Sequence, residues 1–322
     1  MGFISLGDFI DLFYKIKGRG VKFILGKISL YAESRTINTW NNIDNNSSNW
    51  WIIEAVRKRW NKLISGDEEL EFEDYIAAKY LNGKENVSIL SVGCGEGVHE
   101  IAFSKYSNIT NIKGIDIAAG PLKKAKQEAA RLNVQHMTFE NISFEDFITK
   151  EIFDIILFNS SLHHFKNISA VLLKANNILS EKGLIIINEY TGPNMFQFGK
   201  QRKNLLNKTL KAIPANLKLR QNSKRIKNAI YEPGILRMYI ADPSEACNSS
   251  AIIECLNRQF NAIEEKKLGG DILHFVLKDI AHNFLSGKPE TVSTLQYLFK
   301  IEDDYINGKK YSDFMFGIYQ KK

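Results

Sequence analysis

The chain has 322 residues, of which 44% are hydrophobic and 25% are charged, and its formal net charge is +7. This composition excludes a disordered chain, and the length suffices for one large domain or two smaller ones with buried cores. Three cysteines without a Cys-x-x-Cys pair exclude a disulfide framework and a structural zinc site of that kind, so we expect a reducing compartment. No apolar run reaches about 18 residues, and the first residues lack the features of a secretory signal, so neither a membrane-spanning helix nor a leader is expected.

Residues 1–83 are predicted to form a helical cap. They contain no proline, and apolar residues from Trp51 to Trp60 recur at helical spacing. Residues 84–192 alternate short β-rich runs with helical runs, which predicts a parallel sheet with right-handed crossovers. The expected strands are residues 87–92, 111–115, 136–139, 153–158 and 184–189, and the expected helices are residues 98–106, 121–132 and 169–179.

Residues 193–248 are predicted to form a basic insertion that acts as a lid. Ten lysine and arginine residues, and no Asp or Glu, lie between Asn194 and Tyr231, so the rest of the chain is mildly acidic. Apolar residues recur at helical spacing from Leu205 to Leu217. The favoured interpretation is a solvated helix face. The alternative is contact with an acidic acceptor, nucleic acid or an anionic membrane, and the apolar and basic stretch Phe9–Tyr31 supports peripheral membrane contact.

Residues 249–322 are predicted to complete the α/β core. We expect a helix near residues 250–259, a strand near residues 262–268, two further helices, and a last strand at residues 313–319. The acidic run Glu302-Asp303-Asp304 is a metal-ligand candidate by composition alone. A solvated helix face is the favoured interpretation of this run, so no metal site is predicted.

The most specific feature is a glycine-rich turn. Gly93, Gly95 and Gly97 follow an apolar strand and lead directly into a helix. Glycine lets the main chain approach a ligand closely, and the start of the helix offers free N–H groups. Asp116 follows nineteen residues after Gly97, at the end of the next strand, where a carboxylate can accept both hydroxyls of a ribose. The spacing G-x-G-x-G differs from the G-x-G-x-x-G of dinucleotide-binding enzymes.

At these residues the sequence resembles the class I S-adenosylmethionine-dependent methyltransferases, whose first motif is commonly D/E-x-G-x-G-x-G. The resemblance covers roughly residues 84–192 and resumes with the last strands. It implies a Rossmann-like, seven-stranded, mostly parallel sheet with helices on both faces, together with the N-terminal cap and the inserted lid. It also implies that the three glycines face the amino-acid part of S-adenosylmethionine, and that Asp116 and the adjacent Ile117 contact its nucleoside.

One residue departs from the pattern of this family. The leading acid of the first motif is replaced by Ser91, which can form a hydrogen bond but cannot neutralise the ammonium group of the cofactor. Glu96 or Glu100 could compensate for the missing charge. The departure keeps open a third class of protein, a noncatalytic scaffold that binds the cofactor.

Two later segments carry the same resemblance. After the third strand, Asn141 and Ile142 lie where the family holds the adenine, which implies one polar and one apolar contact. The fourth strand ends at Asn159, which the resemblance places beside the cofactor. The Leu-His-His run that follows at Leu162–His164 is found in many small-molecule methyltransferases.

The chemistry of methyl transfer sets what the site must contain. The reaction is an in-line displacement with a good leaving group, so the enzyme mainly aligns the reactants and excludes water. An alcohol acceptor needs a base, and His163 and His164 lie in a loop at the carboxyl ends of the strands. Either histidine could be the base, or both could support the loop. Glu189 could bind or deprotonate a hydroxyl, or could instead accept hydrogen bonds from loop N–H groups.

These observations predict a methyltransferase that uses S-adenosylmethionine, releases S-adenosylhomocysteine and O-methylates a small molecule or saccharide in natural-product or glycan biosynthesis. Residues 159–162 lack the N/D-P-P-Y/F run that enzymes use to methylate exocyclic nitrogen. Carboxyl, nitrogen or carbon acceptors stay open as alternatives. An RNA methyltransferase is less favoured, because no RNA-binding module is recognisable. A cytoplasmic location is expected, with peripheral contact to the inner face of the membrane as a further hypothesis.

Overall fold

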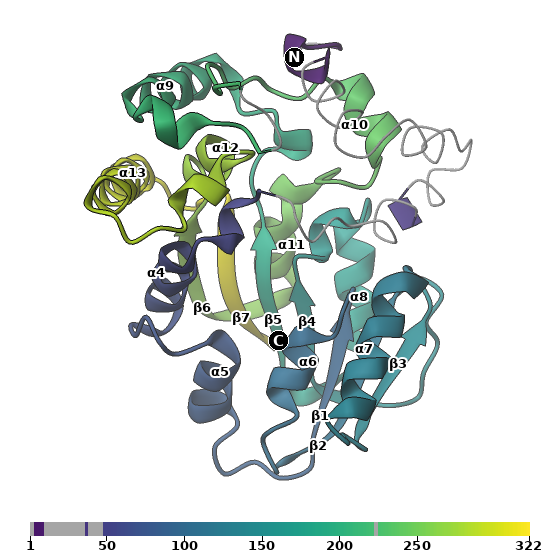
Figure 1. Ribbon diagram of the computed structural model, residues 1–322. Coiled ribbons are helices and arrows are strands. Elements are labelled where there is room, and N and C mark those ends of the chain that lie inside the picture. The colour runs from purple at the N-terminus through teal and green to yellow at the C-terminus, as the bar shows by residue number, and fades with distance from the viewer. Residues whose placement is uncertain (1–2, 10–35, 38–47, 222–224) are drawn as a thin grey trace.

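The computed structural model describes residues 3–9, 36–37, 48–221 and 225–322 (Figure 1). Residues 10–31 of the basic and apolar N-terminal stretch, and Lys224 of the basic insertion, lie outside the described residues. Within them, seven strands form one sheet in the order β3-β2-β1-β4-β5-β7-β6. The strands are β1 (Val87–Val92), β2 (Ile109–Asp116), β3 (Met137–Asn141), β4 (Phe153–Asn159), β5 (Leu179–Tyr190), β6 (Phe260–Gly269) and β7 (Phe314–Lys321).

The sheet confirms the expected fold class. Strands β1 to β5 run parallel, and β7 is antiparallel to both β5 and β6. The parallel strands are long apolar runs because both of their faces are covered, as β4 shows. Ile155 and Leu157 pack into the hydrophobic cluster on one face, whereas Ile156 and Phe158 pack into the cluster on the other. The edge strand β6 carries Glu and Lys side chains, which discourage pairing with another chain.

Helices cover both faces of this sheet. Side chains of α4, α5, α6 and α7 join one cluster, and those of α8 and α11 join the other. Figure 1 shows α9, α10 and α12 beyond the carboxyl end of β5. The bounds are α4 (Glu54–Ser65), α5 (Phe72–Tyr80), α6 (Val98–Phe103), α7 (Ala119–Arg131), α8 (Ile168–Ile178), α9 (Gly199–Ala212), α10 (Ile235–Ala241), α11 (Ile252–Gln259), α12 (Leu273–Leu277) and α13 (Pro289–Asn307). None of the helices in the described part of the chain has the length and apolar character needed to cross a bilayer.

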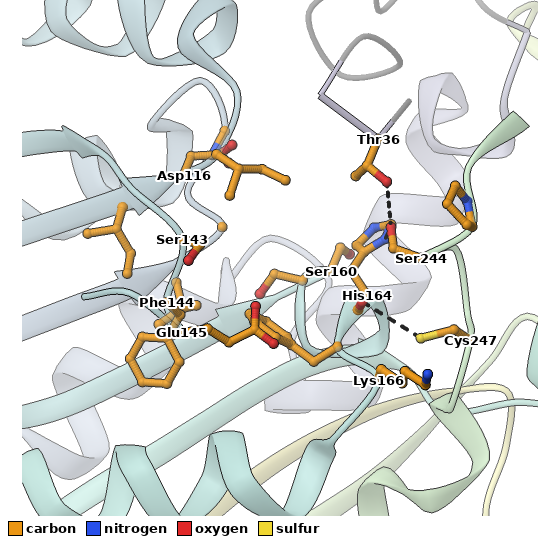
Figure 2. A pocket seen from close by; sticks show the side chains of 18 of the residues that line it. Thr36, Asp116, Ser143, Phe144, Glu145, Ser160, His164, Lys166, Ser244 and Cys247 are labelled. Carbon is orange, nitrogen blue, oxygen red and sulfur yellow. Dashed lines mark hydrogen bonds between the residues drawn. The ribbon is translucent and has the colours of Figure 1, made fainter. Parts of the chain in front are cut away.

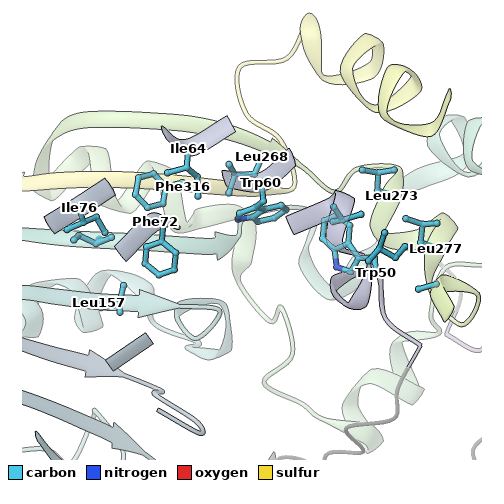
Figure 3. Packing of buried hydrophobic residues seen from close by; sticks show 14 of the residues in the cluster. Trp50, Trp60, Ile64, Phe72, Ile76, Leu157, Leu268, Leu273, Leu277 and Phe316 are labelled. Carbon is cyan, nitrogen blue, oxygen red and sulfur yellow. The ribbon is translucent and has the colours of Figure 1, made fainter. Parts of the chain in front are cut away.

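The first long helix starts later than the apolar spacing suggests. Trp50–Ile52 form a 3-10 turn, and Ile53 is extended with φ −82° and ψ 113°, so α4 begins at Glu54. Trp60 on α4 packs edge-on against Trp50 with ring centroids 5.5 Å apart (Figure 3). Its indole Nε1 donates to Asn188 Oδ1 at 3.2 Å. This hydrogen bond attaches the N-terminal helices to β5, next to the strand end where ligands bind.

The basic insertion is less exposed than its sequence suggests. Its apolar side chains between residues 205 and 217 are largely buried, as the helical spacing predicts. Two of its cations are also buried, so for them the expectation of a solvated face is wrong. The guanidinium of Arg202 bonds to Asp313 and to the carbonyl of Asp271, and Lys227 Nζ donates to three backbone carbonyls of residues 275–278. A buried charge needs such partners, and these two cannot attract an acidic molecule.

The acidic run on α13 also differs from expectation. Glu302 is fully buried rather than solvated, and its carboxylate accepts hydrogen bonds from the backbone N–H groups of residues 271, 272 and 273 at 2.8–3.0 Å. These N–H groups stand at the start of α12, where helical backbone leaves donors without partners. Glu302 on α13 therefore caps the N-terminus of α12. Its neighbour Asp303 forms an ion pair with Arg59. The division of the chain at residues 83, 192 and 248 stays a prediction.

Candidate functional site

A cavity of about 640 Å³ opens at the carboxyl ends of β1, β2 and β4 (Figure 2). Its walls come from the turns after these strands, from residues 142–145 after β3, and from residues 239–247 of the insertion. The strand order reverses between β1 and β4, and open α/β sheets bind their ligands at such a switch point. The volume lies within the range of small-molecule sites, roughly 300–1,000 Å³.

The glycine turn forms one wall of the cavity. Gly93 has φ +72°, and a Cβ at this position would lie 2.5 Å from the Cβ of Ser161. Gly95 has φ +54°, but a Cβ there would meet no protein atom within 4 Å, because this glycine faces the open cavity. Gly97 does not line the cavity. A Cβ at this position would collide with Ala125 and Phe139, so a glycine is required here for α7 and β3 to pack against the turn.

Asp116 closes this end of the cavity. Its Oδ2 accepts the N–H of Gly95 at 2.9 Å, and its Oδ1 accepts the N–H of Ala118 at 2.7 Å. Burial raises the pKa of this carboxyl, and the two N–H groups work against that rise. Each carboxylate oxygen has two lone pairs, so both oxygens can still accept from a ligand. Ile117 lines the cavity beside it.

The residues after β3 divide into a wall and a support. Ile142 lines the cavity, and its N–H donates to the carbonyl of Asp116 at 3.1 Å. The side chain of Asn141 donates to the same carbonyl at 2.8 Å and does not line the cavity. Ser143 and Phe144 continue the wall, as Figure 2 shows.

Ser91, which replaces the leading acid of the first motif, lies behind the glycine turn. Ser91 is buried and does not line the cavity. Glu100 on α6 is also buried, and its pKa is raised by burial even though the Ser91 hydroxyl hydrogen-bonds to its carboxyl group. Glu96 points elsewhere and pairs with Lys124 at 2.6 Å. Of the two candidates for compensation, Glu100 is therefore the one next to Ser91.

The loop after β4 is fixed by β5. Asn159 Oδ1 accepts a hydrogen bond from the side chain of Asn188 at 2.9 Å, and the N–H of Ser160 donates to the carbonyl of Asn188 at 2.9 Å. Asn159 does not line the cavity, whereas Ser160 and Ser161 do. Ser161 Oγ is buried, and no described residue hydrogen-bonds to it. A buried hydroxyl without a partner beside Gly93 is a place where a polar ligand group fits.

Glu189 holds this loop from below. It is fully buried, and its Oε1 accepts the N–H groups of Ser161 at 2.5 Å and Leu162 at 2.6 Å. Its Oε2 lies 2.7 Å from His163 Nδ1. Neither Glu189 nor His163 lines the cavity. Burial lowers the pKa of His163, but the charge of Glu189 and its hydrogen bond outweigh burial and raise it overall. The geometry supports the loop-holding alternative for Glu189.

His164 is the histidine that lines the cavity. Its Nδ1 lies 3.0 Å from Ser244 Oγ, and this hydroxyl donates to the buried Asp242 Oδ1 at 2.6 Å. Because the proton of Ser244 points to Asp242, His164 Nδ1 must be the donor to Ser244, which leaves the lone pair on Nε2. Burial and the neighbouring His163 lower the pKa of His164. A neutral imidazole with this tautomer can accept a proton.

Sequence reasoning missed Asp242 and Ser244. Thr36 also donates to Asp242 Oδ1, at 2.8 Å, so this carboxylate joins Thr36 to the turn that holds Ser244 and, through Ser244, to His164. A signal was available, because Asp242 and Glu245 are among the first acidic residues after the basic stretch. Figure 2 shows Asp116 and His164 on opposite sides of the cavity.

The strand order, the glycine turn and the acid at the end of β2 define an α/β protein that binds a nucleoside cofactor at the switch point of its sheet. Comparison with protein families gives the particular group. Residues 83–280 match the family described as a methyltransferase domain, and the chain belongs to this family.

Two curated relatives show how far the likeness extends. The ubiquinone biosynthesis O-methyltransferase of Candida albicans is 25% identical over 127 residues, which cover 39% of this chain and 37% of the relative. The malonyl-[acyl-carrier protein] O-methyltransferase of Bacillus cereus is 26% identical over 130 residues, which cover 38% of this chain and 47% of the relative. The chain therefore spans less than half the length of these relatives.

Two solved structures are similar over more of the chain. The plantazolicin methyltransferase BpumL, in complex with S-adenosylhomocysteine and a triazolic desmethylPZN analogue, is 19% identical with a TM-score of 0.44, covering 96% of this chain and 99% of BpumL. The [4+2]-cyclase SpnF is 14% identical with a TM-score of 0.46, covering 78% of this chain and 79% of SpnF.

Proposed function

We propose that this protein binds S-adenosylmethionine in the cavity and transfers its methyl group to an oxygen atom of a small molecule or saccharide. One observation carries the proposal: a single cavity joins the glycine turn and Asp116 to a neutral imidazole at the opposite end. Membership in the methyltransferase-domain family supports the same conclusion. The cofactor, when bound, supplies a methyl group on a sulfonium that leaves as a neutral thioether.

The glycine turn and Asp116 form the cofactor end of the cavity. Asp116 accepts the two ribose hydroxyls, and Gly95 leaves room for the amino-acid part of the cofactor. Ile142 and Ile117 provide apolar contacts to the nucleoside. Ser161 Oγ, which is buried beside Gly93, donates to a polar group of the cofactor.

The other predicted cofactor residues act through these contacts. Gly97 lets α7 and β3 pack behind the turn, and Asn141 fixes the main chain of Asp116. Asn159 ties the loop after β4 to β5, and Ser91 hydrogen-bonds to Glu100 behind the turn. We therefore propose positioning roles for these four residues.

At the acceptor end, we propose that His164 acts on the acceptor hydroxyl. Ser244 and Asp242 orient its imidazole through the hydrogen bonds at 3.0 and 2.6 Å. His163 and Glu189 are positioning residues, because neither lines the cavity. The carboxylate of Glu189 already accepts the backbone N–H groups of Ser161 and Leu162 in the loop. An acceptor hydroxyl that loses its proton becomes the nucleophile for the in-line displacement.

We further propose that the acceptor is reached from an apolar surface such as the inner face of a cytoplasmic membrane. Phe3, Leu6 and Phe9 are 60–65% exposed, and Tyr239 on α10, which lines the cavity, is half exposed. The carbonyl of Phe3 accepts the N–H of Leu236, so this apolar group, Phe3, Leu6, Phe9 and Tyr239, lies next to α10. Exposed apolar groups of this kind mark interaction sites. Flotation with anionic vesicles should recover the wild type and lose Phe3→Glu/Phe9→Glu, and equal recovery would contradict the membrane proposal.

The function is tested by titration calorimetry followed by turnover assays. We expect one molecule of S-adenosylhomocysteine to bind per chain, and we expect its release from S-adenosylmethionine in the presence of phenol, saccharide or hydroxy-acid acceptors. His164→Gln should abolish turnover and keep cofactor affinity. Absence of binding at millimolar S-adenosylhomocysteine would refute the proposal. Tight binding of S-adenosylhomocysteine with no turnover on any acceptor would instead support a noncatalytic scaffold that binds the cofactor.

A further inference from the structure

The two adjacent histidines are held by different partners, His163 by a carboxylate and His164 by a serine hydroxyl. His163 Nδ1 lies 2.7 Å from Glu189, which comes from β5. His164 Nδ1 lies 3.0 Å from Ser244, whose hydroxyl bonds to Asp242 from the insertion. In the neutral form of each ring, the Nδ1 proton of His163 points to Glu189 and that of His164 points to the Ser244 hydroxyl, which leaves a lone pair on each Nε2. A general base needs a hydrogen-bond acceptor at Nδ1 on one histidine, whereas here both histidines have one. Metal-binding histidines characteristically donate their second nitrogen to such a partner.

A third acceptor joins the two imidazoles. Glu245 follows Ser244 in the turn after α10, and its Oε1 lies 3.7 Å from His163 Nε2. Among the described residues, His163, His164 and Glu245 form the group whose ligand atoms could hold a metal, with all three atoms within 4.8 Å of one another. In a tetrahedral zinc site, ligand atoms about 2.1 Å from the metal stand about 3.4 Å apart. The His163–Glu245 pair is close to that separation.

We propose that His163, His164 and Glu245 bind a divalent transition metal, with Zn²⁺ as the reference ion, next to the acceptor end of the cavity, which His164 lines. Two imidazoles and one carboxylate are a donor set that such ions accept, and three protein ligands leave a position open for a further ligand. Glu245 is the adjustable ligand, because its side chain is 28% exposed and lies on a turn, whereas the histidine side chains are fixed by Glu189 and Ser244.

The role of this metal rests on the proposed methyl transfer. His164 and Ser244 line the cavity, so an acceptor hydroxyl beside them can occupy the open position. There the acceptor O–H bond breaks and its proton passes to water. The oxygen then forms a bond to the methyl carbon while the carbon–sulfur bond breaks with its electron pair staying on sulfur. The sulfonium becomes a neutral thioether, and His164, as a metal ligand, acts on the acceptor hydroxyl through the metal.

Metal binding is measured on the full chain after dialysis against a chelator. Zn²⁺ is titrated by calorimetry, and Co²⁺ is titrated by its visible absorption, which reports the ligand field directly. We expect one ion per chain with micromolar or tighter affinity. Glu245→Gln keeps the size of the side chain at a partly exposed position and should weaken binding at least a hundredfold. Glu254→Gln is the matched control, because Glu254 is an exposed carboxylate that pairs with Arg258, and its metal affinity should equal that of the wild type.

A variant of Asp242, which orients His164 through Ser244, and a measurement of cofactor binding distinguish the possible results. Asp242→Asn should weaken Zn²⁺ binding about 10–100-fold, the usual effect of removing a partner of a ligand. Binding of S-adenosylhomocysteine to each variant shows that it is folded. Equal metal affinity in the wild type and Glu245→Gln overturns the proposal, as does turnover that a chelator leaves unchanged. Those results leave the methyltransferase assignment standing, whereas zinc binding without cofactor binding refutes that assignment and supports the metal site alone.

Discussion

Replacing Gly95 with alanine tests the cofactor site, because the added methyl group has two separable effects. Gly95 has φ +54°, and a left-handed conformation costs an L residue about 1–2 kcal/mol, so the free energy of unfolding should fall by about that amount. No protein atom lies within 4 Å of the added Cβ, which instead takes space assigned to the cofactor. We expect the Kd of S-adenosylhomocysteine to rise at least about tenfold, which is about 1.4 kcal/mol.

Gly66→Ala is the matched control for this experiment. Gly66 follows α4 with φ +91°, also meets nothing within 4 Å, and does not line the cavity. It should lose similar stability in urea unfolding and keep wild-type cofactor affinity in calorimetry. Gly93→Ala should be less stable than either variant, because its Cβ would lie 2.5 Å from that of Ser161. Equal cofactor affinity in Gly95→Ala and Gly66→Ala would refute the reasoning.

Three further predictions concern ionisable side chains. Asp116→Asn should raise the Kd of S-adenosylhomocysteine at least about tenfold in calorimetry, because one acceptor oxygen is lost; an unchanged Kd would remove this residue from ribose binding. Burial and the charge of Asp271 raise the pKa of Glu302 to about 7 from an ordinary 4.5, so folding favours its protonated form. Its contribution to stability should therefore fall as the pH rises from about 4.5 through 7, and the advantage of the wild type over Glu302→Gln in urea unfolding should shrink by about 2–4 kcal/mol between pH 5 and pH 8. A constant difference would contradict that pKa. Arg202→Met should cost about 3–5 kcal/mol in the same assay because it leaves Asp313 buried without its partner, and Arg202→Met/Asp313→Asn should recover part of the loss.

The sheet could be predicted from the sequence because its signals are local. Strand β1 has the predicted bounds of residues 87–92, and the other parallel strands overlap their predicted ranges, since each is an apolar run bounded by turns. The predicted helix at Trp51 was wrong at its start. Asn49 accepts the N–H of Trp51 and caps a 3-10 turn there, a choice that apolar spacing cannot report.

The candidate site could be predicted only in part, for the same reason. Gly95 and Asp116 lie in one short motif, and both line the cavity. The link from His164 to Ser244 joins residues 80 positions apart, and nothing in either segment indicates the other. Glu302 looked like a surface residue because its partners, the N–H groups of α12, are backbone atoms that carry no sequence signal.

The place of β7 in the sheet has a consequence for biosynthesis. Hydrogen bonds to β7 connect β6 to the rest of the sheet, since β7 lies between β5 and β6. On the ribosome, β7 is made after the other six strands. Until it emerges, β5 exposes an edge that ends in the segment holding Glu189, the residue that fixes the loop of His163. An unpaired apolar strand of this kind favours aggregation in nascent chains, so slowing translation before residue 314 should lower the yield of folded protein.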